Sequence, residues 1–334
     1  MSPPLGYISV PNVVIVGGSI LRIGHFEADS LMYVYFKRDA GRYYTRDEFL
    51  RFVEKKTLRT IQKYDMLKYN DVIAVAVSGG KDSVALLYIL DKIERSFQTE
   101  LVIIHVDEGI SNYSEYSTPI IYRHARELGL RVYMTSFKEM FGYTIDDVAR
   151  SYFEGRIDLE PCSFCGEWRR WCLNYLALKA NATVITTAHT LDDFAQTILI
   201  NVMRNSIAQL FRISIGRSEE MEGFVPRVYP FAELYEKETA LYTHLRDLEH
   251  NDAPCPYAEL SMRWDLRMFL YEQEEKHPGI LYNILRFHQN FIGYGKREPI
   301  KLRRCDICGY PTPHKICRAH QLKEMLDETT RTVP

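Results

Sequence analysis

The chain has 334 residues, enough for two to three domains of ~100–150 residues each. Its residues are 46% hydrophobic and 26% charged, so it can bury a sizeable core, which excludes a globally disordered protein. Lys and Arg number 42 against 44 Asp and Glu. The resulting formal net charge of −2 excludes a generally basic protein that coats nucleic acid, but it allows a local basic face.

The sequence carries no recognisable membrane or export signal. No apolar run approaches the ~20 residues that a membrane-spanning helix requires. The opening residues MSPPLGYISVP lack the basic start and apolar core of a secretory signal. The seven cysteines are odd in number and include two CxxC pairs, which in a reducing compartment favours metal or redox chemistry over disulfides. We therefore expect a soluble, cytoplasmic protein without membrane contact.

The N-terminal residues 1–45 read as short strand-like runs, at 13–16 and 31–36, separated by glycines. A helical pattern follows over 46–63, where apolar residues share one broad stripe. From residue 71 short apolar runs alternate with helical stretches. Predicted strands are 73–77, 101–106, 130–135 and 183–187, and predicted helices are 83–93, 115–128 and 191–203.

This alternation predicts an α/β fold, in which a Rossmann-like parallel sheet carries helices on both faces. Residues 167–179 and 235–291 are also predicted to be helical, and 300–320 to form a compact cysteine-containing unit. We expect three parts: a small β-rich segment at 1–45, a catalytic domain with a helical extension at 46–292, and a zinc-binding segment at 293–334.

The strongest motif lies between the predicted strand 73–77 and the predicted helix 83–93. It reads Ser78-Gly79-Gly80-Lys81-Asp82-Ser83. Its glycines let backbone N–H groups approach an anion, and the following helix adds unpaired donors and a positive dipole end. The serines add hydroxyl donors and Lys81 a point charge, while Asp82 suits a bound Mg²⁺ or a substrate hydroxyl. Walker spacing fails, because Val75 occupies its first glycine position.

Two more loops follow strands of the same predicted sheet. The second strand ends in HVDEG, with His105 and Asp107, and the fourth in AHTLDD, with His189, Asp192 and Asp193. The paired aspartates are open to two interpretations. They could simply be acids that the dipole favours at a helix start, or one of them could act in catalysis or on Mg²⁺.

Three cysteines precede the tail in two separate motifs. Cys162 and Cys165 form a CxxC pair in PCSFCG, and Cys255 lies between two prolines in PCPY. A CxxC pair alone is compatible with a redox dithiol, half of a zinc site or half of an iron–sulfur site. Cys172 is a competing ligand, but its neighbours Trp168 and Trp171 favour a packed thiol.

The tail carries a second, more complete metal motif. Cys305, Cys308, Cys317 and His320 have the spacing C-x2-C-x8-C-x2-H. Two short knuckles joined by a turn are typical of a tetrahedral structural zinc site. His314 is an alternative fourth ligand, but His320 preserves the two-residue knuckle and is preferred.

These motifs together resemble a known family. SGGKDS resembles the PP-loop of the ATP pyrophosphatase superfamily, whose members cleave ATP between the α and β phosphates. Six motifs occur in chain order over about residues 46–320. They are SGGKDS, HVDEG, PCSFCGEWRR, AHTLDDFAQT, the stretch from CPYAELSMRWDLRMF onward and the Cys knuckle. In this combination they resemble the TtcA/TtuA-type tRNA 2-thiolation enzymes.

The resemblance implies a tRNA 2-thiouridine synthetase that adenylates the C2 oxygen of a uridine and then transfers sulfur through a 4Fe-4S cluster. ATP and Mg²⁺ would bind the loop Ser78–Ser83, with contacts from His105, Asp107 and His189. Lys81, Asp82, Asp193 and Arg169 would act in catalysis, and Cys162, Cys165 and Cys255 would hold the cluster. Arg169 lies four residues after the second cysteine of the CxxC pair, at a position where the family has a basic residue. An arginine there can stabilise phosphate but cannot shuttle protons.

The same resemblance implies partners. The substrate would be tRNA, the sulfur would come from a ubiquitin-like thiocarboxylate carrier protein, and the enzyme could be a homodimer. Candidate phosphate contacts are Arg204, Arg212, Arg217, Lys296, Arg297, Lys301, Arg303 and Arg304. Residues 1–45 depart from the family, because they contain no cysteine where relatives often carry a finger. Two rival functions are a PP-loop tRNA-modifying ligase of the lysidine type, which needs no cluster, and a non-catalytic tRNA-binding scaffold.

Overall fold

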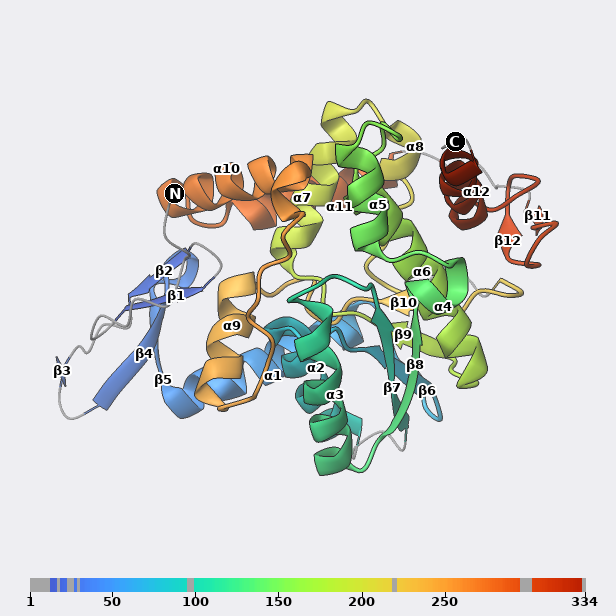
Figure 1. The fold of residues 1–334 in the computed structure, drawn as a ribbon. Helices are drawn as coiled ribbons and strands as arrows, with labels where there is room; N and C mark the ends of the chain where they lie inside the picture. Colours follow the sequence, from blue (N-terminus) through green and yellow to red (C-terminus); the bar gives the residue numbers. More distant parts are fainter. Residues whose placement is uncertain are drawn as a thin grey trace.

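The structure, a computed structural model, describes residues 13–16, 19–22, 27–28, 31–94, 99–217, 221–294 and 302–331. Its centre is a five-stranded sheet in the order β10-β9-β6-β7-β8, and every neighbouring pair is parallel (Figure 1). The strands are β6 (Val72–Ala76), β7 (Glu100–Asp107), β8 (Arg131–Ser136), β9 (Val184–Thr186) and β10 (Arg227–Val228). The predicted parallel α/β fold is therefore confirmed.

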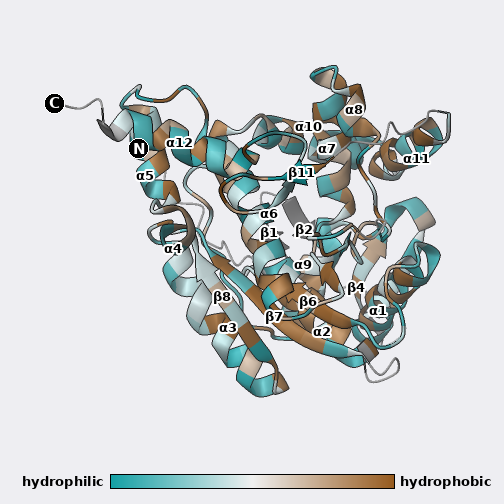
Figure 2. Cartoon of the chain, turned by 90° about the vertical axis from the view of Figure 1, so that its right-hand side faces the viewer, coloured by the Kyte–Doolittle hydropathy of each residue, from teal (hydrophilic) through white to brown (hydrophobic). Residues whose placement is uncertain are grey.

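Helices cover both faces of this sheet because its strand residues alternate between two apolar cores. Val75 and Ile103 point into one core, whereas Ala74 and Ile104 point into the other. The first core is built with α1 (Arg46–Lys63), α2 (Lys81–Glu94), α3 (Ser114–Leu128), α7 (Leu191–Met203), α9 (Glu236–Leu245), α10 (Met262–Lys276) and α11 (Ile280–Gly293). The second uses α4 (Phe137–Phe141), α5 (Ile145–Phe153), α6 (Pro161–Lys179) and α12 (Arg318–Arg331). Figure 2 shows the apolar strands β6 and β7 beside α2.

The first strands lie outside the central sheet. They are β1 (Val13–Val16) paired with β2 (Ser19–Arg22), and β3 (Glu27–Ala28), β4 (Leu31–Lys37) and β5 (Arg42–Thr45) in an antiparallel sheet, with η1 (Arg38–Ala40) between the last two. Tyr35 of β4 donates a hydrogen bond to Glu238 of α9 (2.9 Å), and the ammonium group of Lys37 lies 3.0 Å from the same oxygen. Glu238 is fully buried, so this N-terminal sheet is anchored directly to α9.

The predicted helical region 235–291 is interrupted. Residues 246–257 form an irregular segment between α9 and the short η2 (Ala258–Leu260), which we call the bridging segment. The helix predicted over 167–179 begins earlier, at Pro161, because proline suits the first position of a helix. The CxxC pair therefore lies inside the first turns of α6 and not in a loop before it.

The remaining elements are short. They are α8 (Ile207–Leu210), β11 (Arg303–Arg304) and β12 (Pro311–Thr312). Tail residues Cys305, Cys317 and Leu322 join the core on the α6 side of the sheet. Among the residues that the structure describes, no helix combines the length and apolarity needed to cross a membrane.

Candidate functional site

The SGGKDS loop follows β6 at the carboxyl edge of the sheet, where parallel α/β sheets bind ligands. Gly79 has φ +86°, and a Cβ at this position would lie 2.9 Å from the Cβ of Ser117, so only glycine fits. Ser83 closes the loop: its hydroxyl donates to the Gly80 carbonyl (2.8 Å) and accepts from the Ser78 N–H (3.2 Å). The backbone of this loop is thus fixed before any ligand binds.

Lys81 is held between two carboxylates. Its Nζ lies 2.9 Å from Oδ2 of Asp82 and 2.7 Å from Oε1 of Glu236. Burial alone would lower the pKa of Lys81, but the two carboxylates raise it above its usual range. Thr239 of α9 donates to the other oxygen of Asp82. Lys81 therefore carries a positive charge at a fixed position.

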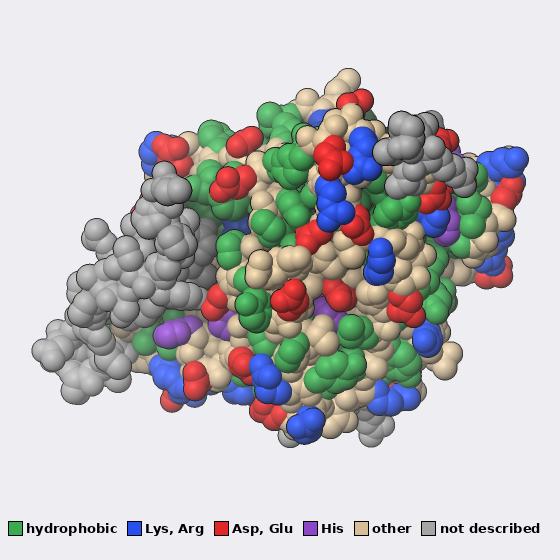
Figure 3. All heavy atoms as spheres, in the orientation of Figure 1, with side chains coloured by type: hydrophobic (Ala, Val, Ile, Leu, Met, Phe, Trp, Pro, Cys, Tyr) green, Lys and Arg blue, Asp and Glu red, His purple; other side chains and the backbone are tan. Residues whose placement is uncertain are grey.

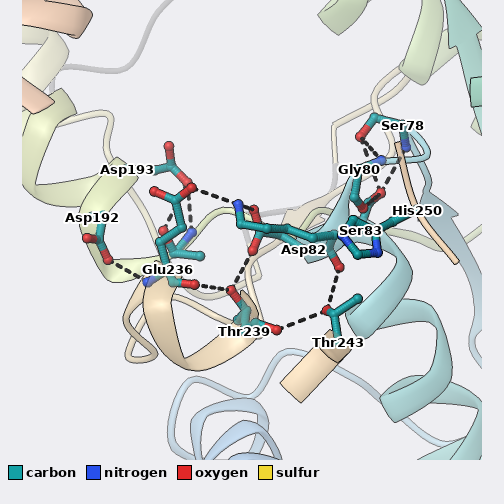
Figure 4. A network of polar contacts seen from close by, with 12 residues as sticks. Ser78, Gly80, Asp82, Ser83, Asp192, Asp193, Glu236, Thr239, Thr243 and His250 are labelled. Carbon is teal, nitrogen blue, oxygen red and sulfur yellow. Dashed lines mark hydrogen bonds and ion pairs between the residues drawn. The ribbon is translucent and has the colours of Figure 1, made fainter. Parts of the chain in front are cut away.

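Glu236, the first residue of α9, is the centre of this network (Figure 4). It accepts bonds from Arg267 (2.6 and 2.8 Å) and Tyr271 (2.5 Å) of α10 as well as from Lys81. Burial would raise the pKa of Glu236, but Lys81 and Arg267 lower it to about 2. Glu236, Thr239, Arg267 and Tyr271 were not predicted as site residues. Glu236 and Thr239 lie in none of the motifs, and Arg267 and Tyr271 lie in the stretch after Cys255, where no residue was given a role.

The two aspartates at the start of α7 have different surroundings. Asp193 accepts from the backbone N–H (2.9 Å) and the hydroxyl (3.2 Å) of Thr190, and so completes a capping box. Asp192 is buried and accepts the backbone N–H of Glu236 (2.8 Å). Burial, and then the negative charge of Glu236, raise the pKa of Asp192 to about 8. The structure therefore separates a half-buried carboxylate, Asp193, from a buried acid, Asp192.

The predicted nucleotide contacts lie at the ends of their strands. Nδ1 of His105 is 2.9 Å from the Val77 carbonyl, and its buried Nε2 has no hydrogen-bond partner among the described residues. Asp107 accepts from the N–H of Gly109 (2.8 Å) and shapes the turn after β7. Nδ1 of His189 is 2.8 Å from the hydroxyl of Thr187. Burial lowers the pKa of both histidines, so both are neutral hydrogen-bonding groups at pH 7.

The cysteine pair on α6 is connected to both the loop after β7 and the bridging segment. Arg169, one turn after Cys165, donates to its sulfur (3.0 Å) and to Glu108 (2.9 Å). On the other side the thiol of Cys162 lies 3.4 Å from the carbonyl oxygen of Tyr257, two residues after Cys255. The fold therefore brings Cys255 to the pair although 90 residues separate it from Cys165.

The three thiols influence one another electrostatically. Burial raises the pKa of Cys165 to about 12, although the Arg169 guanidinium partly offsets it. Burial, followed by the nearby Cys255, raises the pKa of Cys162, and burial raises that of Cys255. Cys172 is separate: it is fully buried in the apolar core on the α6 side of the sheet.

The tail motif forms a compact group. One ligand atom each of Cys305, Cys308, Cys317 and His320 lie within 4.8 Å of one another. The Sγ atoms of Cys308 and Cys317 are 3.8 Å apart, and Nδ1 of His320 lies 3.2 Å from the latter. Burial would raise the pKa of Cys305, but backbone N–H groups of the knuckle, led by that of Cys317, lower it to about 7. Such a set of three thiols and an imidazole could hold one tetrahedral zinc ion.

The predicted phosphate contacts divide into three groups. Arg204 and Arg212 are exposed, as are Arg303 and Arg304. Arg217 was assigned wrongly: its side chain is 9% exposed and forms an ion pair with Asp71 (2.8 Å) beside the amino end of β6. Lys296, Arg297 and Lys301 lie outside the described residues. On the face drawn in Figure 3 positive and negative side chains are interspersed.

Comparisons with known proteins agree with this geometry. A family model described as a PP-loop domain matches residues 51–267. The chain is similar to a probable sulfurtransferase of Methanocaldococcus jannaschii, with 32% identity over 85% of this chain and 83% of that protein. It is also similar to cytoplasmic tRNA 2-thiolation protein 1 of Oryza sativa subsp. japonica, with 33% identity over 86% and 78%. A solved structure of the U34-tRNA thiolase NcsA from Methanococcus maripaludis with its 4Fe-4S cluster superposes with a TM-score of 0.76 and 27% identity, over 88% of this chain and 93% of that one.

Proposed function

Since the chain belongs to the PP-loop family of tRNA 2-thiolation proteins, we propose that it is a tRNA sulfurtransferase that replaces the C2 oxygen of a uridine by sulfur at the expense of ATP. One observation carries the proposal. A phosphate-binding loop at Ser78–Ser83 and three thiols at Cys162, Cys165 and Cys255 are joined through the bridging segment at one edge of the sheet. A ligase of the lysidine type would have no use for the three thiols.

The first step is adenylation. The C2 oxygen of the uridine attacks the α-phosphorus of ATP, the bond from that phosphorus to the bridging oxygen breaks, and pyrophosphate leaves. The SGGKDS backbone binds the phosphates, while Lys81 and Arg169 neutralise the charge that develops. Asp82 and Glu236 support this role because they keep Lys81 protonated and fixed. Asp82 would hold a Mg²⁺ ion, which would supply further positive charge to the phosphates. His105, Asp107 and His189 would contact the nucleotide.

The second step exchanges oxygen for sulfur. A sulfur nucleophile attacks C2, and AMP leaves with the former C2 oxygen, which adenylation has converted into a good leaving group. We assign the positioning or deprotonation of the base to Asp193, whose side chain is half-buried and so partly accessible, rather than to the buried Asp192.

The three thiols fit a 4Fe-4S cluster. All three are free, they lie partly exposed, and their raised pKa values would be relieved by a bound cationic centre, which favours thiolates. The fourth nearby cysteine, Cys172, is packed in the core and is no ligand. When bound, such a cluster supplies an iron with an open coordination position for a sulfur donor. Cys162, Cys165 and Cys255 would hold it, and Arg169 would stabilise the thiolate of Cys165.

The tail and the surface complete the proposal. Zn²⁺ bound by Cys305, Cys308, Cys317 and His320 would fix the segment 293–334 against the catalytic domain 46–292, with 1–45 as an N-terminal β unit. Arg204, Arg212, Arg303 and Arg304 are exposed and would contact tRNA phosphates. A ubiquitin-like carrier with a thiocarboxylate would deliver the sulfur in the cytoplasm. A homodimer is part of the same proposal.

The test is anaerobic reconstitution of the full-length protein with iron and sulfide, followed by incubation with unmodified tRNA, ATP, Mg²⁺ and sulfide. We expect 2-thiouridine in the digested tRNA by mass spectrometry, and one pyrophosphate for each base modified. Ser variants of Cys162 or Cys255 should still release pyrophosphate but make no 2-thiouridine. Pyrophosphate release without thiolation by the loaded wild type would favour the ligase instead, and no tRNA-dependent release would favour a scaffold.

A further inference from the structure

The bridging segment touches the phosphate loop through its backbone. The N–H of Asn251 donates to the carbonyl oxygen of Gly79 at 2.8 Å. That carbonyl shares one planar peptide unit with the N–H of Gly80, which lies in the anion-binding part of the loop. Because the unit is rigid, any rotation that turns the Gly80 N–H toward a phosphate also moves the Gly79 oxygen to which Asn251 is bonded.

The side chain of Asn251 fixes this contact to α3. Its Nδ2 donates to the Tyr113 carbonyl (2.8 Å) and to the hydroxyl of Ser117 (3.0 Å), the residue that packs on Gly79. Its Oδ1 accepts from the N–H of Ala253 (2.9 Å) and so closes an Asx turn. Asn251 therefore holds the phosphate loop, the start of α3 and the next residues of its own segment together.

The rest of the segment is stiff up to the third thiol. Pro254 and Pro256 flank Cys255 and fix the backbone on both sides. Beyond Cys255, the hydroxyl of Tyr257 donates to Asp146 (2.7 Å), and its carbonyl lies near the thiol of Cys162. On the outer side, between α3 and the segment, lies a cavity of 420 Å³. The segment is thus held by hydrogen bonds at both Asn251 and Tyr257, with open space on its outer side.

We propose that Asn251 is a positioning residue that couples phosphate binding at the SGGKDS loop to the placement of Cys255. When a triphosphate accepts a hydrogen bond from the Gly80 N–H, the shared peptide unit rotates and displaces Asn251. The Asx turn and the prolines carry this displacement to Cys255. The inference rests on the proposed function, because it requires that ATP binds this loop. Coupling is reciprocal by thermodynamic linkage, so a modification that displaces Cys255 weakens ATP binding by the same factor.

The test measures the alkylation rate of Cys255 by iodoacetamide in the reduced full-length protein, purified without iron–sulfur reconstitution, with and without ATP and Mg²⁺. Peptide mass spectrometry reads each cysteine separately, and calorimetry gives the ATP dissociation constant of each variant. We expect ATP to slow alkylation of Cys255 by about fivefold or more in the wild type, the lower end of typical coupling. Rates at the tail cysteines should not respond.

Three variants distinguish coupling from direct shielding by the nucleotide. Asn251→Ala removes the side-chain bonds, and Pro254→Gly softens the connection while leaving the loop contacts in place. Both should bind ATP yet lose most of its effect on Cys255. Asp252→Ala is the matched control. Its side chain pairs with His250 (2.8 Å), two residues earlier, and has no ion pair with the loop among the described residues, so the variant should keep the effect.

The outcomes separate this inference from the function on which it rests. If ATP binds but Cys255 alkylation does not change, or if both loss variants retain the full effect, the coupling is refuted and the proposed function stands. If no variant, nor the wild type, binds ATP, the proposed function fails and the coupling fails with it.

Discussion

Asp192 makes a sharp prediction about stability and pH. In the folded protein burial and the charge of Glu236 raise its pKa to about 8, from a reference value of 3.8. Between these two values the folded state holds a proton that the unfolded state has released. Stability must therefore fall as pH rises through this window, and the substitution Asp192→Asn should abolish that loss. The asparagine oxygen can still accept the Glu236 N–H.

The magnitude follows from the pKa difference. Each pH unit inside the window costs about 1.4 kcal/mol, so the wild type at pH 7 has lost about 4 kcal/mol relative to a protonated Asp192. The asparagine variant should therefore gain on the wild type as pH rises. Between pH 5 and pH 7.5 we expect the difference in unfolding free energy to grow by about 3 kcal/mol.

Urea denaturation without nucleotide or added Mg²⁺, followed by fluorescence at both pH values, measures this difference. Asp193→Asn is the matched control: it makes the same chemical change one residue along the helix, and it should lower stability by about 1 kcal/mol through the weakened capping box. A variant at position 192 whose advantage over the wild type is the same at pH 5 and pH 7.5 would refute the raised pKa and the buried environment that causes it.

Three further predictions concern the loop, its network and the tail. Gly79→Ala places a side chain against Ser117 on a left-handed backbone, at a cost of about 1–2 kcal/mol. Calorimetry should therefore show ATP affinity reduced by about tenfold or more, and an unchanged dissociation constant would contradict the loop geometry. Glu236→Gln breaks a buried ion pair with Lys81 and should cost about 3–5 kcal/mol in denaturation experiments, partly recovered by ATP. Cys308→Ser should lower the zinc content measured by mass spectrometry, whereas His314→Ala should retain it; the reverse result would reassign the fourth ligand.

Much of the fold was predictable because its signals are local. Strand and helix periods alternate in the sequence, and the helix 191–203 was predicted with both ends correct. The glycine pair and its position between a strand and a helix located the phosphate loop. The tail motif was equally explicit, because four ligands at knuckle spacing lie within 16 residues of chain.

What the sequence could not supply depends on contacts between distant elements. Glu236 reaches Lys81 from a helix more than 150 residues away, Arg267 of the next helix in turn pairs with Glu236, and no spacing rule connects the three. The different environments of Asp192 and Asp193 arise from packing against α9, which adjacent identical residues cannot reveal. Arg217 was assigned to tRNA from its charge and the family resemblance, although it pairs with Asp71 beside the amino ends of the strands, opposite the phosphate loop.

The anchor between β4 and α9 has a consequence for any shortened form of the protein. Lys37 and Tyr35 satisfy Glu238, a carboxylate with no exposed surface, two residues from Glu236. Deleting the first 45 residues would remove Lys37, so the buried Glu238 would lose its positive partner. The negative charge of Glu236 would then be left close to that of Glu238 without compensation. We therefore expect a protein shortened in this way to lose stability at the start of α9, where Glu236 binds Lys81.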